Sequence, residues 1–240
     1  MTSSVPLRRA RNDPQQYEDL VDSWWDPTGP FVMLHWIAEA RARLIPPAPR
    51  RGALLVDLGC GAGLLAPHLV DKGYEHVGVD LTRSALGLAR DHGAHVVCAD
   101  VGAVPLPSGA ADVVVAGEIL EHVTDLDRVV AEACRVLAPG GTLVIDTIAN
   151  TALARLLVVT IAERIPRGAP KGIHDPRLFV DRRRLVTLCA RYEVDVELFG
   201  LRPTMRAIVG RDGRRRPKRT MTQTMTTSVL FQGVGKKRLP

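Results

Sequence analysis

The chain has 240 residues, a formal net charge of +6 and 46% apolar residues, which fits one large domain with extensions. Its four cysteines are widely spaced, without a CxxC pair or a Cys/His cluster, and this argues against a zinc site and a disulfide framework. The first residues lack an apolar run, and the longest aliphatic stretch, residues 156–162, is far shorter than the ~20 residues of a membrane span. We therefore expect a cytoplasmic protein with reduced thiols.

Most of the positive charge lies in one segment, RDGRRRPKR at residues 211–219, which has six basic residues and one acidic residue. This composition favours a solvated loop, with a weak site for anionic lipid or nucleic acid as the alternative. No aromatic side chain interleaves with the basic residues, which counts against a platform for single-stranded nucleic acid. We expect no nucleic-acid partner and leave the oligomeric state open.

Residues 1–50 differ from the rest of the chain because they contain all three tryptophans and end in a proline-rich stretch at residues 46–52. Such stretches mark boundaries between elements. We expect a helical extension over residues 1–50 that forms a lid on a domain spanning residues 51–240.

From residue 53, short aliphatic runs alternate with helical patterns. Strands are predicted at residues 53–58, 76–80, 95–100, 112–118 and 142–146, and helices at residues 64–72, 84–92 and 126–138. Because these strands are apolar along most of their length, they fit a parallel sheet that is covered on both faces. The predicted fold class is therefore α/β, with a doubly wound, Rossmann-like sheet.

The C-terminal part breaks this alternation. Strands are predicted at residues 194–201 and 228–233 with no helix between them, which indicates a hairpin around a basic loop at residues 210–220. The sheet is then seven-stranded and mostly parallel, with one antiparallel C-terminal strand. A segment at residues 151–180 is inserted before this hairpin.

The first strand runs into a glycine-rich turn, VDLGCGAG at residues 56–63. Glycines let the backbone come close to a ligand, and ligands of open α/β sheets bind at the carboxyl ends of the strands. A dinucleotide site requires G-x-G-x-x-G, and Leu64 stands where its third glycine belongs. The spacing of Gly59, Gly61 and Gly63 is instead similar to that of class I methyltransferases that use S-adenosylmethionine (SAM); a plain glycine-rich turn is the alternative.

Acidic residues lie near the same edge of the predicted sheet. Asp80 ends the second strand, where a carboxylate can accept hydrogen bonds from ribose hydroxyls, and Asp100 ends the third, where an acceptor can meet an adenine amino group. Asp57 either holds the turn, the role we favour, or faces the sulfonium and amino group of SAM. Leu81 and Val101 flank these acids, and we include them in the predicted cofactor site.

Several motifs together resemble a known family. The turn VDLGCGAG, Asp80, the run EILEHV at residues 118–123 and LAPGG at residues 137–141 are similar to class I SAM-dependent methyltransferases in general. Two further motifs, WWDP at residues 24–27 and PKGIHD at residues 170–175, resemble more narrowly the O-methyltransferases of ubiquinone biosynthesis. The similarity covers roughly residues 17–200.

The resemblance implies that SAM contacts Arg41, Gly59, Asp80 and a residue near Gly117, and that S-adenosylhomocysteine is the product. It also implies methylation of a hydroxyl on a phenolic or catechol acceptor that carries a polyprenyl chain. The family's Arg-Ile-Asn-Pro is replaced here by WIAE at residues 36–39, so a phenolic natural product is an equal alternative. C- or N-methylation of another small molecule, and a non-catalytic module that binds SAM or nucleic acid, are further alternatives.

Three candidate chemical groups follow the fourth strand at the cofactor edge: Glu118, Glu121 and His122. Two carboxylates and an imidazole can bind Mg²⁺ or another divalent ion, and the resemblance implies such a site; pocket lining without a metal is the alternative. A phenol with a pKa near ~10 must lose its proton to attack a methyl group well. We therefore predict Glu121, His122 and His174 as catalytic groups.

The lid and substrate contacts are assigned to Trp24, Trp25, His35 and Asp175, although the tryptophans could equally anchor the extension. The inserted segment contains an apolar helical pattern with a basic flank, at residues 152–164. We expect this helix either to cover the pocket or to rest on an anionic membrane surface.

Overall fold

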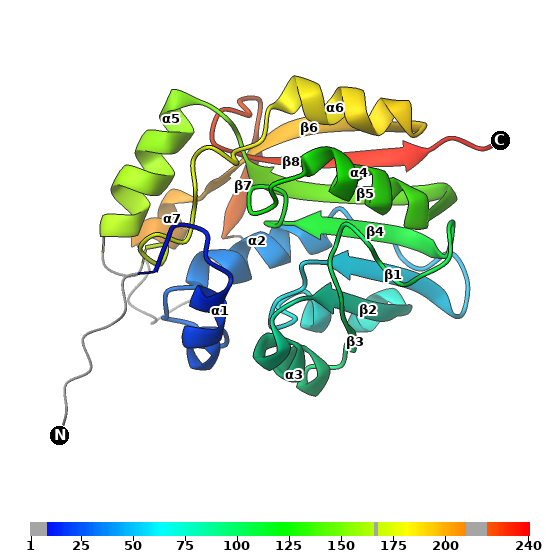
Figure 1. Cartoon of the computed structure of the whole chain (residues 1–240), viewed down its shortest axis with the longest axis horizontal. Helices are drawn as coiled ribbons and strands as arrows, with labels where there is room; N and C mark the ends of the chain where they lie inside the picture. Colours follow the sequence, from blue (N-terminus) through cyan, green and yellow to red (C-terminus); the bar gives the residue numbers. More distant parts are fainter. Residues whose placement is uncertain (1–8, 166–167, 210–219) are drawn as a thin grey trace.

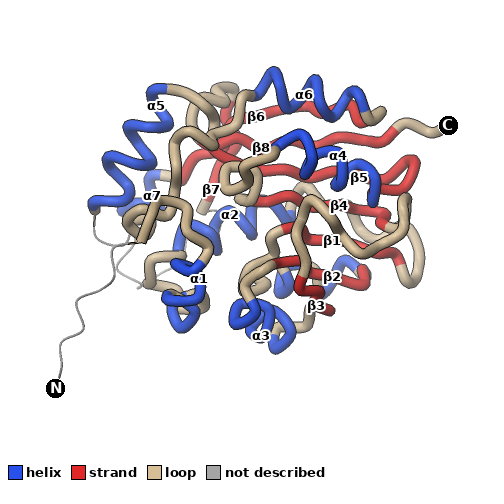
Figure 2. The backbone as a smooth tube through the Cα atoms, viewed as in Figure 1, coloured by secondary structure: helices blue, strands red, loops and turns tan. Residues whose placement is uncertain are grey.

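One sheet of eight strands forms the centre of the protein, in the order β3-β2-β1-β4-β5-β8-β6-β7 (Figure 1). The computed structural model describes residues 9–165, 168–209 and 220–240. The predicted basic loop at residues 211–219 lies outside these residues. Helices cover both faces of the sheet (Figure 2), which confirms the doubly wound α/β fold.

The first five strands pair in parallel and form the half of the sheet that carries the glycine-rich turn. Their bounds are β1 Ala53–Leu58, β2 Tyr74–Asp80, β3 His95–Cys98, β4 Ala111–Gly117 and β5 Leu137–Ile148. Strand β1 lies between β2 and β4, so its apolar residues are buried on both faces. This is the environment in which an uninterrupted apolar run is stable as a strand.

The C-terminal strands are β6 Val194–Pro203, β7 Met221–Thr224 and β8 Leu230–Lys237. Strands β6 and β8 pair antiparallel, as predicted, but a helix and a further strand lie between them in the chain. Strand β8 lies between β5 and β6 and is antiparallel to both. A short helix, α7 (Met205–Val209), follows β6, and β7 then pairs with the end of β6. The prediction missed β7, and therefore the eighth strand, because four residues of sequence MTQT lack a clear apolar alternation.

Two capped helices, α4 (Leu126–Val136) and α6 (Arg182–Arg191), pack on one face of the sheet. Each begins after an aspartate, Asp125 or Asp181, whose carboxylate accepts a hydrogen bond from a backbone N–H of the first turn. Helix α4 ends earlier than predicted, because Leu137 is already extended and starts β5.

The opposite face is covered by α2 (Val32–Ala42), by residues 64–72 and, at β2 and β3, by α3 (Arg83–Asp91). The predicted helix at residues 64–72 is wrong: the chain forms two 3₁₀ turns, η2 (Ala66–His68) and η3 (Val70–Lys72). Pro67 has no backbone N–H to continue a helical ladder, and Gly73 ends the segment in a left-handed conformation.

Two segments from distant parts of the sequence lie at the carboxyl ends of the parallel strands (Figure 1). One is the N-terminal extension, with α1 (Gln15–Asp19), η1 (Val21–Ser23) and α2. The other is a continuous helical stretch labelled α5, formed by α5 (Ala152–Ala154), a π-helical part η4 (Arg155–Ile161) and η5 (Ala162–Arg164). Among the described residues, no helix is long and apolar enough to cross a membrane.

Candidate active site

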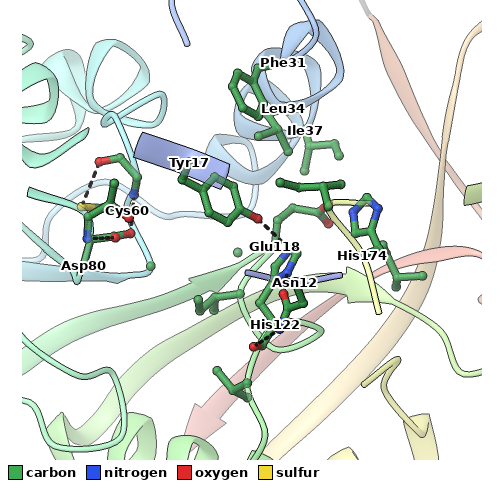
Figure 3. Close-up of a pocket in the computed structure, with 18 of the residues that line it drawn as sticks. Asn12, Tyr17, Phe31, Leu34, Ile37, Cys60, Asp80, Glu118, His122 and His174 are labelled. Carbon is green, nitrogen blue, oxygen red and sulfur yellow. Dashed lines mark hydrogen bonds between the residues drawn. The ribbon is translucent and has the colours of Figure 1, made fainter. Parts of the chain in front are cut away.

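A cavity of about 610 Å³ opens at the carboxyl ends of the parallel strands, between the sheet, the N-terminal extension and α5 (Figure 3). This volume is within the range of sites for small molecules and cofactors. Its floor is the glycine-rich turn. Gly59 and Gly61 both have positive φ, 69° and 50°, so the turn requires residues without a Cβ.

The glycine turn is also packed too closely for side chains. A Cβ on Gly59 would lie 2.6 Å from Ile119, and a Cβ on Gly61 would lie 2.7 Å from the Trp24 indole. Trp24 stacks on Phe31 with ring centroids 4.4 Å apart, and the Trp25 indole N–H donates to the carbonyl of Ala62 over 3.1 Å. The tryptophans therefore hold the turn against the extension.

Asp80 at the end of β2 organises the next part of the floor. Its two carboxylate oxygens accept hydrogen bonds from the backbone N–H groups of Gly61 (2.9 Å) and Thr82 (2.8 Å). Asp80 lines the cavity, and each of its oxygens can accept a further hydrogen bond. Asp80 can therefore accept hydrogen bonds from ribose hydroxyls while it holds the turn in place.

Asp100 lies on the rim of the cavity and is half exposed. Its carboxylate accepts from the Gly102 N–H over 2.8 Å and lies 3.2 Å from the Arg128 guanidinium. Asp57 is buried, and its Oδ1 has no hydrogen-bond partner among the described atoms. Asp57 lines the cavity, and a buried carboxylate oxygen without a partner is suited to accept from a donor such as the amino group of SAM.

A buried ion pair closes the far side of the cofactor region. The Arg41 guanidinium donates two hydrogen bonds, of 2.6 and 2.7 Å, to the carboxylate of Asp146 at the carboxyl end of β5. A Cβ on Gly117 would lie 2.0 Å from this guanidinium, so only glycine admits Arg41 here. Arg41 lines the cavity, and a guanidinium has further N–H donors that can bind a carboxylate of the ligand.

Two glutamates follow β4, and both are affected by burial. Glu118 lines the cavity with a positive φ of 53°, and burial, with the charges of Glu121 and Asp146, raises its pKa. Glu121 is fully buried, and its carboxylate accepts a 2.6 Å hydrogen bond from Thr147. Burial raises the pKa of Glu121 to about 7.

His122 lies where the N-terminal extension meets the inserted segment (Figure 3). Its Nδ1 is 2.5 Å from Asn12 Oδ1 and its Nε2 is 3.2 Å from the Tyr17 hydroxyl. His174 stacks on its ring with centroids 5.5 Å apart. Burial and the neighbouring His174 lower the pKa of His122 to about 3, so the imidazole is neutral at physiological pH.

The residues predicted to bind a metal do not fit a divalent ion in this arrangement. Glu121 is bonded to Thr147, and both ring nitrogens of His122 have partners from the extension. Within the described ranges, no group of three His, Cys, Asp or Glu side chains is spaced to hold a metal ion. The side chains would have to rearrange to bind a divalent ion, so the metal site stays a prediction and carries no step of the proposed chemistry.

Most of the predicted site residues do meet at this cavity. Those that line it are Trp24, Arg41, Asp57, Gly59, Gly61, Asp80, Leu81, Asp100, Val101, Gly117, Glu118, His122 and His174. Five others lie outside its lining: Trp25, His35, Gly63, Glu121 and Asp175. Gly63 instead packs closely against α3, because a Cβ there would lie 2.7 Å from the backbone of Ala89.

The other four residues outside the lining have partners elsewhere. Trp25 stacks on His92 and His35 bonds the Trp24 carbonyl over 2.8 Å. Asp175 is paired with Arg177, and Glu121 lies behind the cavity wall. The structure therefore does not place these side chains at the reacting atoms.

The sequence analysis missed four functional positions. Asn12 and Tyr17 contact His122, Asp146 holds Arg41, and Glu163 joins the extension to the inserted segment. Asp146 had a signal, since it is an acid near the end of a predicted strand at the cofactor edge. The other three have no local signal, because only the tertiary fold brings them to the site.

Comparison with known proteins agrees with this geometry. Residues 56–145 match a family described as a methyltransferase domain. A ubiquinone biosynthesis O-methyltransferase from Thiobacillus denitrificans is 35% identical over 191 residues, covering 76% of this chain and 82% of that protein. Another, from Methylococcus capsulatus, is 36% identical over 165 residues, covering 65% and 70%. A solved structure of a SAM-dependent methyltransferase from Thermotoga maritima superposes with a TM-score of 0.66 at 15% identity, covering 93% of this chain and 97% of that one.

The fold and the cofactor region thus define a class I SAM-dependent methyltransferase. The cavity fits SAM, because its glycine turn, the orphaned oxygen of Asp57 and the donors of Arg41 match the groups of this cofactor. Within the class, the chain belongs to the family of the ubiquinone biosynthesis O-methyltransferases. The non-catalytic alternative is not supported.

Proposed function

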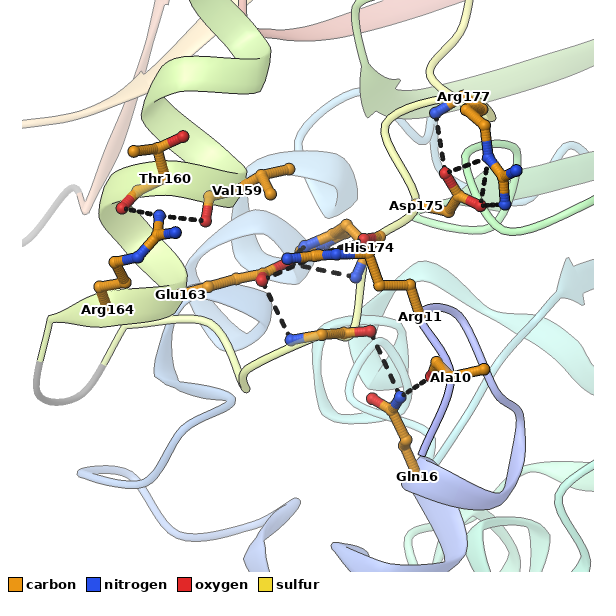
Figure 4. Close-up of polar contacts among 11 residues, drawn as sticks. Ala10, Arg11, Gln16, Val159, Thr160, Glu163, Arg164, His174, Asp175 and Arg177 are labelled. Carbon is orange, nitrogen blue, oxygen red and sulfur yellow. Dashed lines mark hydrogen bonds and ion pairs between the residues drawn. The ribbon is translucent and has the colours of Figure 1, made fainter. Parts of the chain in front are cut away.

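We propose that this enzyme transfers the methyl group of SAM to a hydroxyl of a phenolic or catechol acceptor. The observation that carries the proposal is the placement of His174, which lines the cavity and whose Nδ1 lies 3.5 Å from the buried carboxylate of Glu163 (Figure 4). An imidazole can take a proton from an attacking hydroxyl, which is the group that an O-methyltransferase must activate, and a neighbouring carboxylate stabilises the imidazolium that forms.

The second half of the cavity supports an acceptor with an apolar part. Its walls come from α2, the end of β5, the inserted segment and β8. Their aliphatic side chains include Met33, Ile37, Ile148, Val158, Ile165, Ile173 and Leu230. An apolar wall of this kind favours a ring with hydrocarbon substituents over a charged acceptor. A polyprenylated phenol and an apolar phenolic natural product both meet this requirement.

The chemistry follows from the arrangement of side chains. When bound, SAM supplies an activated methyl group whose bond to sulfur breaks, leaving the electron pair on sulfur, as the bond to the acceptor oxygen forms. Asp80, Arg41 and the glycine turn hold the two ends of the cofactor, and the extension excludes water. His174 takes the proton of the acceptor hydroxyl, and the carboxylate of Glu163 beside its Nδ1 stabilises the charge that forms on the ring. The sulfonium loses its charge in the same step.

The test is turnover on a panel of catechols and polyprenylated catechols, with and without EDTA, followed by mass spectrometry and NMR of the products. We expect a methyl group on oxygen, higher kcat/KM for acceptors with an apolar chain, and turnover that survives EDTA, because the predicted metal ligands are engaged elsewhere. A methyl group on carbon or nitrogen would contradict the proposal and favour the alternative methyltransferase activities.

We also propose a peripheral contact with an anionic membrane through the outer face of the inserted helix. Its side chains Leu153, Leu156, Leu157 and Ile161 are 38–49% exposed, and Arg155 and Arg164 lie near the two ends of this stretch. An apolar face with basic ends is typical of helices that lie in a membrane interface. Such a contact would bring a lipidic acceptor to the cavity that the same helix lines.

Sedimentation with vesicles tests this contact. We expect binding to vesicles that contain phosphatidylglycerol, weaker binding to pure phosphatidylcholine, and loss of binding in a Leu156→Ser, Leu157→Ser variant. Val70→Ser is the matched control, because Val70 is 78% exposed on η3. Equal binding of both variants would contradict the assignment to this helix.

A further inference from the structure

A buried histidine lies directly behind the cofactor half of the cavity. His76 is in the middle of β2, its side chain is 5% exposed, and it is not among the residues that line the cavity. Its Nε2 lies 3.6 Å from Oδ2 of Asp57. Neither ring nitrogen has a hydrogen-bond partner among the described residues. Such an imidazole requires an explanation, because an unsatisfied polar group inside a protein is costly.

The register of the sheet brings His76 and Asp57 together. His76 pairs with Leu55 on β1, and Asp57 is two residues further along that strand. Side chains two residues apart point to the same face of a sheet, so the imidazole and the carboxylate share one face. The other neighbours of Asp57 in the sheet are Gly78 on β2 and Val115 on β4, which have no polar side chain. His76 is therefore the polar side chain that the neighbouring strands offer to this carboxylate.

Asp57 differs from the other acids of the cofactor half in how its carboxylate is held. The carboxylates of Asp80, Asp100 and Asp146 each accept hydrogen bonds from backbone N–H groups or from a guanidinium. At Asp57, Oδ1 has no partner among the described atoms, and Oδ2 lies beside His76. The contact with the imidazole therefore positions the Asp57 side chain.

The chemistry of the two groups decides which atoms face each other. An ionised carboxylate only accepts hydrogen bonds, so the nitrogen that approaches Oδ2 must carry a proton. Nε2 of His76 is this nitrogen. With Oδ2 engaged by the ring, Oδ1 is the oxygen left for a ligand, and Asp57 lines the cavity. The amino group of SAM is a cationic N–H donor of the kind that such an oxygen binds well.

We propose that His76 is a positioning residue for the cofactor: its Nε2–H holds Oδ2 of Asp57 and thereby keeps Oδ1 available to the amino group of SAM. His76 acts through Asp57, because it lies outside the cavity lining itself. Without the imidazole, the carboxylate could rotate about its Cβ–Cγ bond, a torsion with broad minima, and would spend less time in the orientation that binds the amino group. The inference concerns cofactor binding alone and does not depend on the acceptor.

The first experiment compares two ligands that differ by one amino group. S-adenosylhomocysteine has this group, and 5′-S-(3-carboxypropyl)-5′-thioadenosine is the same molecule without it. We expect His76→Leu to raise the dissociation constant of S-adenosylhomocysteine about 10-fold and that of the second ligand by less than about twofold, as measured by calorimetry. A general disturbance of the sheet would weaken both ligands equally, so the difference between them separates positioning from packing.

A conservative variant and a control accompany this comparison. His76→Gln keeps a side-chain N–H donor in place of Nε2–H, and its dissociation constant for S-adenosylhomocysteine should stay within about threefold of wild type. His95→Leu is the control, since His95 is an exposed histidine on the neighbouring strand β3 and lies outside the cavity lining. The control variant should bind both ligands as wild type does.

The second experiment reads the imidazole in the wild-type protein. Nitrogen-15 NMR of the histidine side chains in the full-length protein, with His76 assigned by His76→Gln, should show a proton on Nε2. A ring with a lone pair on Nε2 would overturn the inference, because two acceptors would then face each other. This measurement still decides if His76→Leu does not fold.

The calorimetric outcomes are also distinct. Equal losses of both ligands in His76→Leu, or an unchanged dissociation constant for S-adenosylhomocysteine, would contradict the role of His76. No acceptor is present in either experiment. A wild-type enzyme that binds S-adenosylhomocysteine as expected but methylates no hydroxyl of the catechol panel would refute the proposed function and leave this inference intact.

Discussion

The two halves of the cavity are built differently. The cofactor half consists of residues at or just beyond the carboxyl ends of neighbouring strands, such as Asp80 on β2, Gly117 on β4 and Asp146 on β5. The acceptor half is assembled from α2, the inserted segment and residues 9–17, which meet through side-chain contacts such as Arg11 with Glu163. The backbone hydrogen bonds of the sheet fix the positions of the strand ends. The segments of the acceptor half are instead positioned by their contacts with each other.

This difference indicates which half of the cavity can change without affecting the rest of the domain. A perturbation of the cofactor half should affect the stability of the whole domain, because its polar groups are buried in the sheet. A perturbation of the acceptor half should cause local opening of that half and leave the rest of the domain folded. Binding of the common cofactor and choice of the acceptor are thereby separated within one cavity, as expected for a fold that hosts many activities.

The largest effect is expected at the buried ion pair of the cofactor half. Asp146→Ala should lower the free energy of unfolding by about 3–5 kcal/mol, because it leaves the buried Arg41 guanidinium without its partner. Urea denaturation measures this loss. Asp195→Ala is the control, since Asp195 pairs with Arg238 where both side chains are about 60% exposed, and it should cost less than about 1 kcal/mol. Similar losses in both variants would contradict the comparison.

The next effect concerns cofactor affinity. Asp80→Ala removes the acceptor for the ribose hydroxyls and the carboxylate that holds Gly61. We expect the SAM dissociation constant to rise about 100-fold, equivalent to about 3 kcal/mol, as measured by calorimetry. Asp71→Ala, on exposed η3, should bind SAM as wild type does. An unchanged SAM dissociation constant in Asp80→Ala would show that the Asp80 carboxylate does not bind the cofactor.

A pH effect is expected at the wall behind the cavity. Burial raises the pKa of Glu121 from 4.5 to about 7, so between these values the folded protein holds a proton that the unfolded chain has lost. The free energy of unfolding therefore falls as the pH rises through this window, in total by about 3 kcal/mol.

Glu121→Gln removes this titration and can still accept from Thr147. We expect the variant to be about 2–3 kcal/mol more stable than wild type at pH 8 and similar to it near pH 4.5, by urea denaturation at both pH values. Glu118, whose pKa burial also raises, still titrates in this variant and makes its own contribution to the pH dependence of stability. If the variant is less stable than wild type at pH 8, the Glu121 carboxylate is ionised and fully hydrogen-bonded in the folded wild-type protein.

The smallest effect is expected in the acceptor half. Arg11→Ala removes the pairing with Glu163 and the bond to the carbonyl of His174. Hydrogen exchange of residues 9–17 should become about fivefold faster, equivalent to about 1 kcal/mol of local opening, while the global free energy of unfolding changes little. Arg9→Ala, which removes a partly exposed pair with Asp19, is the control. Loss of global stability in Arg11→Ala would show that the halves are not separable.

Most of the sheet could be predicted because each of its strands carries its own signal. The apolar run of β1, the glycines after it and the acids that end β2 and β5 are local patterns, and parallel pairing brings their carboxyl ends to one edge. Residues 64–72 were mispredicted because Pro67 interrupts the helical ladder. The eighth strand was missed because β7 is too short to show a pattern.

The sequence by itself determined most of the cofactor half of this enzyme: the turn at residues 56–63 and Asp80 follow from local patterns at strand ends. Arg41, on α2, follows from the family resemblance. Only the tertiary structure decided the acceptor half. It turned Glu121 away from the cavity toward Thr147 and gave both nitrogens of His122 to Asn12 and Tyr17. The contacts of His122 join residues 110 and 105 positions apart in the chain, and no local pattern of side chains encodes a partner at that separation.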